Sequence, residues 1–184
     1  MQNLEQQSPE TGTTLAPGTQ MYRILVIGYG NLDRQDDGVA YQVINALRRR
    51  LGQPALGGEE REAEELGNQT DSVFVVQLAP ELLDMVADYD QVIFVDAHVR
   101  DDLSDLHWAP VQPEYAPSTF THHMTPAMLL ALLQILYHRQ PVSYLLTIRG
   151  HTFDFGQGLS TTTEALVEPA AEQILRLLAG PGNV

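Results

Sequence analysis

The chain of 184 residues contains no cysteine. This absence excludes disulfides, thiolate nucleophiles, iron–sulfur clusters and cysteine-ligated zinc. Lysine is absent as well, so all ten cationic side chains are arginines. A Schiff-base lysine and a P-loop are therefore excluded too.

Long apolar runs and basic patches are also missing. No run approaches the roughly 20 residues that a membrane-spanning helix requires. Residues 1–20 have no basic start and no apolar stretch, so we interpret them as a disordered leader rather than a signal peptide, and we expect a cytoplasmic protein. The net charge of −14 repels phosphate backbones and anionic membranes. We therefore expect neither nucleic acid nor a membrane as a partner.

Short apolar runs alternate with helical patterns through residues 21–184, which we interpret as a single domain. An acidic excursion at about residues 52–71 interrupts the alternation and reads as a solvated segment. Alternating strands and helices predict an α/β fold whose parallel sheet is covered by helices on both faces. The predicted strands are 22–27, 73–76, 91–96 and 143–148, with a possible edge strand at 107–111. The first predicted helix starts at Asp36 or Asp37 and is stopped by Gly52, and the others are 81–89, 127–137 and 163–178.

Acids and histidines gather where predicted strands end or helices begin. These residues are Asp36, Asp37, Asp96, His122 and His123. Ligands of α/β sheets bind beyond the carboxyl ends of the strands, so we expect the group to converge there. Two carboxylates and an imidazole suit a divalent metal with open coordination positions. Taken one by one, an acid at a helix start is usually a cap, and an acid at a strand end is often only solvated. A histidine before a helix is usually structural.

Other sites fit the sequence less well. The Gly28-x-Gly30 turn lacks the third glycine of a dinucleotide fingerprint, since Asp33 stands there, and it reads as a tight turn needing positive φ. No Gly-x-Ser-x-Gly elbow is present for a serine hydrolase. His98 and His151 are expected at most to support the site or contact substrate, and His107 and His138 are expected on the surface.

Five motifs, in order and spacing, resemble those of the [NiFe]-hydrogenase maturation endopeptidases. The resemblance runs from about Tyr22 to Leu178. The matching segments are Ile24-Leu-Val-Ile-Gly-Tyr-Gly-Asn31, Asp36-Asp-Gly-Val39, Ile93-Phe-Val-Asp-Ala97, Thr121-His-His-Met-Thr-Pro126 and Phe155-Gly-Gln-Gly-Leu-Ser160.

The resemblance implies a three-layer α/β sandwich with a twisted, mostly parallel sheet. It also implies an aspartic-type peptidase that removes a C-terminal peptide from the hydrogenase large-subunit precursor after nickel insertion. Carried over by motif, the metal-binding and catalytic residues are Asp37, Asp96 and His123, with His122 as the alternative to His123. The nickel is expected to arrive with the substrate, and another divalent metal could occupy the site in the isolated protein.

One segment departs from the family pattern. Gln77-Leu-Ala-Pro-Glu-Leu82 stands where many members carry a glycine–threonine loop, and it is similar to the branch that serves cytoplasmic, NAD(P)-linked or bidirectional hydrogenases. Two other functions stay open on the same scaffold. They are a non-catalytic regulator that binds a metal or nucleotide, and a chaperone that binds the precursor. A monomer is expected, because it is the default for a small processing enzyme.

Overall fold

The computed structural model describes residues 21–57, 66–115 and 124–180. The predicted leader, the centre of the acidic excursion, and both His122 and His123 lie outside these ranges. The described helices include none long and apolar enough to cross a membrane.

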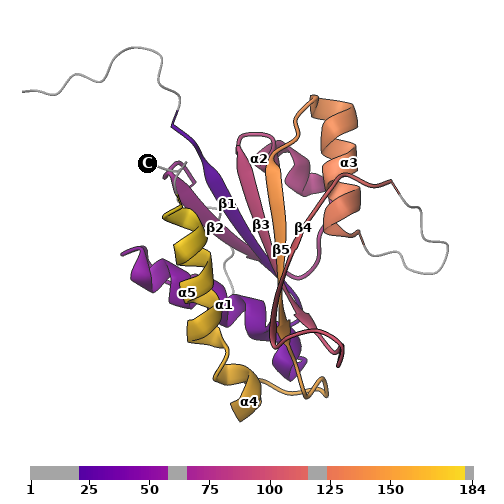
Figure 1. Cartoon of the computed structure of the whole chain (residues 1–184). Helices are drawn as coiled ribbons and strands as arrows, with labels where there is room; N and C mark the ends of the chain where they lie inside the picture. Colours follow the sequence, from indigo (N-terminus) through magenta and orange to yellow (C-terminus); the bar gives the residue numbers. More distant parts are fainter. Residues whose placement is uncertain (1–20, 58–65, 116–123, 181–184) are drawn as a thin grey trace, which may run out of the picture.

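The described residues form a five-stranded sheet in the order β2-β1-β3-β5-β4 (Figure 1). Four strands run parallel. Strand β4, in the segment predicted as a possible edge strand, lies at one edge and pairs antiparallel with β5. The interior strand β1 is an apolar run buried along most of its length, which is typical of a parallel strand covered on both faces. The strands are β1 (Ile24–Tyr29), β2 (Thr70–Val75), β3 (Gln91–His98), β4 (Leu106–Pro110) and β5 (Val142–Arg149).

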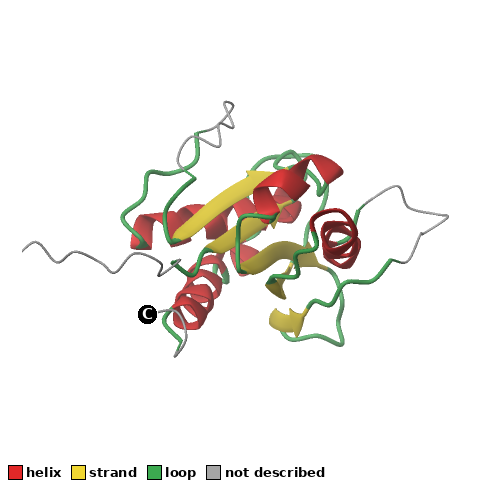
Figure 2. Cartoon of the chain, turned by 90° about the horizontal axis from the view of Figure 1, so that it is seen from above, coloured by secondary structure: helices red, strands yellow, loops and turns green. Residues whose placement is uncertain are grey.

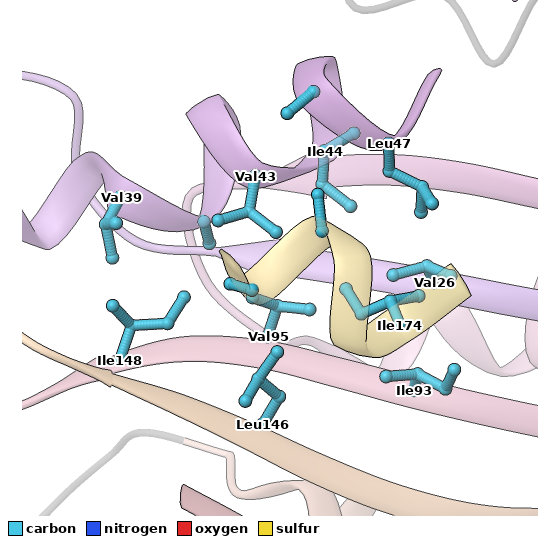
Figure 3. Close-up of a cluster of buried hydrophobic side chains, with 14 of the residues drawn as sticks. Val26, Val39, Val43, Ile44, Leu47, Ile93, Val95, Leu146, Ile148 and Ile174 are labelled. Carbon is cyan, nitrogen blue, oxygen red and sulfur yellow. The ribbon is translucent and has the colours of Figure 1, made fainter. Parts of the chain in front are cut away.

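Helices α1 (Val39–Arg50) and α5 (Val167–Leu178) cover one face of this sheet. Figure 3 shows side chains from both helices meeting alternate residues of the central strands. The alternation follows from the period of two along a strand, which sends every second side chain to the same face. The labelled residues of this layer include Val26, Ile93 and Leu146 from the sheet and Ile44 and Ile174 from the helices.

The opposite face is covered by α2 (Leu83–Val86), by the short 3-10 helix η2 (Pro80–Leu82) that leads into it, and by α3 (Pro126–Tyr137). The other set of alternating strand residues, including Leu25 and Phe94, packs here. Helices therefore lie on both sides of the sheet (Figure 2), which confirms the predicted three-layer α/β sandwich.

Three predicted helices differ from the observed ones. The helix predicted to start at Asp36 or Asp37 begins as a 3-10 helix over Gln35–Gly38, and α1 follows from Val39. The helix predicted over 81–89 ends at Val86 and begins as a 3-10 turn. The helix predicted over 163–178 is divided into α4 (Thr161–Glu164) and α5. Pro169 explains the division, because its missing N–H cannot continue a helix and is tolerated only in the first turn of a new one.

Candidate functional site

Strand β1 ends in a glycine turn that leads into the 3-10 helix η1 (Gln35–Gly38). Gly30 has φ +146°, and a Cβ atom there would lie 2.0 Å from the carbonyl oxygen of Asp37. Gly28 serves a different purpose, because a Cβ there would lie 2.9 Å from Cγ1 of Ile44 in α1. The structure thus confirms a tight turn, in which the glycines admit the backbone of Asp37 and the helix that follows.

Replacing Gly30 with alanine should destabilise the domain by about 3 kcal/mol, through backbone strain and the clash with Asp37. Gly52→Ala is the matched control, because Gly52 also has positive φ (+70°) but nothing lies within 4 Å of its added Cβ. We expect Gly52→Ala to cost only about 1 kcal/mol. Urea unfolding of both variants measures the difference, and equal losses would show that the contact with Asp37 adds nothing.

The first acid of the Asp-Asp pair is completely buried (0% exposed) and fully engaged in hydrogen bonds. Asp36 accepts the backbone N–H groups of His151 (2.8 Å), Thr152 (2.9 Å) and Ser160 (2.7 Å). It also accepts the hydroxyls of Ser160 (2.8 Å) and Thr163 (2.9 Å). Burial alone raises the pKa of Asp36, but these hydrogen bonds outweigh burial and hold the pKa well below its ordinary value. Asp36 therefore joins the β1–α1 turn to the β5–α4 loop.

The second acid, Asp37, is only partly buried and lies at the carboxyl end of the sheet. Its Oδ2 atom accepts the backbone N–H of Asn31 at 3.1 Å. This hydrogen bond orients the carboxylate from the turn beneath it. Of the two adjacent acids, Asp37 is thus the one accessible to a ligand.

Asp96 lies near the end of β3 and completes a carboxylate pair with Asp37. Its Oδ1 atom accepts the backbone N–H of Ala97 at 2.8 Å. Burial and then the negative charge of Asp37 raise the pKa of Asp96 to about 6, against the opposing hydrogen bonds from Ala97 and Tyr29. Because the charge of Asp37 acts on Asp96, the structure brings these two predicted site residues together.

Tyr29 is a member of this site that the sequence analysis did not single out. Its hydroxyl donates a hydrogen bond to the Asp96 carboxylate. Burial and the charge of Asp96 raise the pKa of Tyr29, which keeps the phenol protonated as a donor. The alternation of β1 is the signal that could have found it, because Leu25, Ile27 and Tyr29 share the face from which Asp96 projects.

The predicted histidines do not join the carboxylate pair in the described part of the chain. His123 and its alternative His122 lie outside the described residues, and within the described ranges no group of three or more potential metal-ligating side chains occurs. The ring of His98 is engaged by Ser104 O (3.2 Å) and by the backbone N–H of Arg100 (3.2 Å), so it stabilises the β3–β4 turn. Burial lowers the pKa of His98.

Three more histidines have their places in the described chain. His151 is an exposed residue. It takes part in the site through its backbone N–H, which donates a hydrogen bond to the Asp36 carboxylate. His138 is on the surface, as predicted. His107 was also predicted to be a surface residue, but it is half-buried because it lies within β4.

Comparison with known proteins decides the family. No protein-family model matches the chain. A curated relative, the hydrogenase 2 maturation protease of Escherichia coli (strain K12), is 30% identical over 165 residues, covering 87% of this chain and 93% of the relative. The chain belongs to the hydrogenase maturation protease family.

Solved structures agree with this assignment. The hydrogenase maturating endopeptidase HybD from E. coli matches this maturation protease with a TM-score of 0.64 and 26% identity, covering 87% of this chain and 94% of that one. The [NiFe] hydrogenase maturation protease HycI from Thermococcus kodakarensis KOD1 has the same fold, with a TM-score of 0.61, 17% identity, and coverage of 88% and 96%. The chain is thus a protease with the α/β fold of this family.

Proposed function

We propose that this maturation protease is the endopeptidase that removes a C-terminal peptide from a [NiFe]-hydrogenase large-subunit precursor after nickel insertion. The observation that carries the proposal is the pair formed by Asp37 and Asp96 at the carboxyl end of the sheet. Each carboxylate is oriented by a backbone N–H, and the charge of one acts on the other. Such a pair is suited to a cation, because a cation relieves the repulsion between the two acids.

In this proposal the nickel belongs to the substrate. Asp37 and Asp96 supply oxygen ligands, and His123, by the family resemblance, supplies a nitrogen ligand. Binding to the precursor's nickel positions the scissile peptide beside the two carboxylates and so lowers the entropic part of the barrier. The proposal has two forms. In one, the metal polarises the scissile carbonyl or a water, and in the other it serves recognition alone while Asp37 acts as the base.

The decisive experiment mixes the purified protein with its nickel-loaded precursor and follows intact mass. We expect loss of one defined C-terminal peptide from the loaded form and no change in a nickel-free precursor. Cleavage of both forms would contradict the nickel requirement. If the precursor is verified as the cognate partner and neither form is cleaved, a precursor-binding chaperone or a regulator becomes the better explanation. The monomeric state and the cytoplasmic location stay predictions. Light scattering can test the monomeric state.

Replacing Tyr29 with phenylalanine tests whether the hydrogen bond to Asp96 supports the carboxylate pair. Removing a side chain that hydrogen-bonds to a metal ligand typically lowers the metal affinity by about 10-fold to 100-fold. We expect Tyr29→Phe to weaken the binding of added Ni²⁺ by about 10-fold, measured by isothermal titration calorimetry. Tyr41→Phe is the control, because its hydroxyl donates to Leu56 O (3.1 Å) away from the site. Equal affinity in both variants would remove Tyr29 from the site.

A further inference from the structure

The loop between β5 and α4 presents a large apolar side chain to solvent. Phe155 is 90% exposed, more than any other large hydrophobic residue in the described ranges, of which Val99 at 67% is next. Single exposed apolar residues are common on protein surfaces, so exposure alone means little. What distinguishes Phe155 is how its loop is held and what lies beside it.

Hydrogen bonds fix the loop directly next to Phe155. Gly156 donates its backbone N–H to Asp33 O (3.0 Å) and accepts that of Gln35 at its carbonyl (3.0 Å). The guanidinium of Arg34 donates to Phe153 O at 3.3 and 3.4 Å. Residues 153–156 are thus attached, on both sides of Phe155, to the turn that leads to Asp37.

The start of the loop is anchored as well. Asp36 donates its backbone N–H to Thr152 O (3.0 Å), and its carboxylate accepts the N–H of Thr152. The ring of Phe153 packs against Gly150 so closely that a Cβ there would lie 2.4 Å from Phe153 Cζ. Phe153 is therefore half-buried while Phe155 is exposed. A side chain displayed on a fixed backbone loses less conformational entropy when a partner covers it.

The cation beside Phe155 gives this surface a second feature. Arg34 is exposed and, within the described chain, forms no ion pair. It lies three residues before Asp37 in the sequence, and it pairs with Gly156 in an isolated β-bridge. An arginine whose charge is not paired with an acid among the described residues is notable on a chain with a net charge of −14. Aromatic side chains and arginine are the residues enriched in protein interfaces and their binding hot spots.

We propose that Phe155 and Arg34 form a docking point for the hydrogenase precursor, in which Phe155 enters an apolar pocket and Arg34 meets an acidic group of the precursor. This inference rests on the proposed function and adds a contact outside the carboxylate pair. Arg34 belongs to the turn that carries Asp37, and Phe155 lies on the loop that is hydrogen-bonded to this turn. A partner whose cleavage segment reaches Asp37 therefore passes close to the docking point. It contributes to binding of the precursor and takes no part in the bond-breaking step.

Replacing Phe155 with alanine tests the docking point. We expect the KM for the nickel-loaded precursor to rise by about 10-fold or more with kcat within about twofold, the pattern of a lost binding contact. Phe155→Leu should restore part of the affinity, since it keeps an apolar side chain. Leu136→Ala is the matched control, because Leu136 is also exposed (61%) but lies near the end of α3, toward the amino end of the sheet. Its KM should stay unchanged.

Direct binding separates this inference from the proposed function. Biolayer interferometry on immobilised precursor compares the Kd of the wild type with that of each alanine variant. This measurement does not depend on whether the precursor is cleaved. A weaker Kd for Phe155→Ala alone supports the docking point even if the wild type cleaves nothing. An unchanged Kd and KM for Phe155→Ala, or an equal rise in Leu136→Ala, overturns it. Failure of the wild type to bind the precursor at all overturns both proposals.

Discussion

Replacing Asp36 with alanine is expected to destabilise the domain by about 3–5 kcal/mol, the range for breaking a buried, hydrogen-bonded charge site. The reason is that the donors of His151, Thr152, Ser160 and Thr163 lose their acceptor in a buried place. Urea unfolding followed by circular dichroism measures the loss. Asp33→Ala is the control, because Asp33 is an exposed acid in the same turn, and it should change stability by less than about 0.5 kcal/mol.

The pH dependence of this loss checks its cause. The pKa of Asp36 is lowered in the folded state, so its contribution to stability is fully present above the ordinary pKa of about 3.9 and is lost as pH falls below that value. The difference in unfolding free energy between the wild type and Asp36→Ala should therefore stay constant from about pH 5 to 8 and shrink below about pH 4. A difference that grows toward acid pH would show that the carboxylate is not the stabilising form.

The second large effect concerns the carboxylate pair. Asp37→Asn and Asp96→Asn should each reduce processing of the nickel-loaded precursor by at least about 100-fold, because a metal ligand or a general base is lost. Neither variant should unfold, since both residues are partly exposed. Intact mass against time measures the rate, with Asp33→Asn as the control. Wild-type rates in either variant of the pair would remove that residue from the site.

Asp96→Asn should also make the metal-free protein more stable at neutral pH. The pKa of Asp96 is raised to about 6 by burial and by Asp37, so its stabilising protonated form is fully present below about pH 4 and is lost as pH rises through about 6. Asparagine at this position does not ionise, so the variant does not lose stability in this pH range. The stability of the variant relative to the wild type should therefore rise between about pH 4 and 7 and then level off, at about 1–2 kcal/mol after allowance for partial exposure. Thermal unfolding with a chelator present measures it.

Asp96→Asn is thus expected to gain stability and to lose processing. This combination is typical of a functional site that lowers the stability of the fold. Asp36 and Asp96 illustrate the two opposite cases within one small region. The charge of Asp36 is satisfied by donors from another loop, so it stabilises the fold. The charge of Asp96 is disfavoured by burial and then by the charge of Asp37, so it destabilises the fold. Under the proposed function, the precursor's nickel would relieve this destabilisation.

The sequence allowed the sheet and its two helical layers to be predicted, because the periods of strands and helices are local in the sequence. It also allowed the approach of Asp37 to Asp96 to be predicted, because parallel strands end at the same edge of a sheet. It could not separate the roles of Asp36 and Asp37 by pattern, since adjacent acids at a helix start look alike. The separation depends on Ser160 and Thr163, more than 120 residues further along the chain. Tyr29 was overlooked for a related reason, because its partner Asp96 lies on a neighbouring strand.

The Asp36 hydrogen bonds also bear on the order in which the protein is made. The turn that presents Asp37 reaches its final form only when residues 36 and 160 meet, and 124 positions separate them. Closing so long a loop is slow relative to local helix formation, so this step belongs late in folding. During synthesis the segment that carries Ser160 and Thr163 must leave the ribosome before the turn is completed. Proteolytic competence is thereby delayed until that segment has been made and has met Asp36.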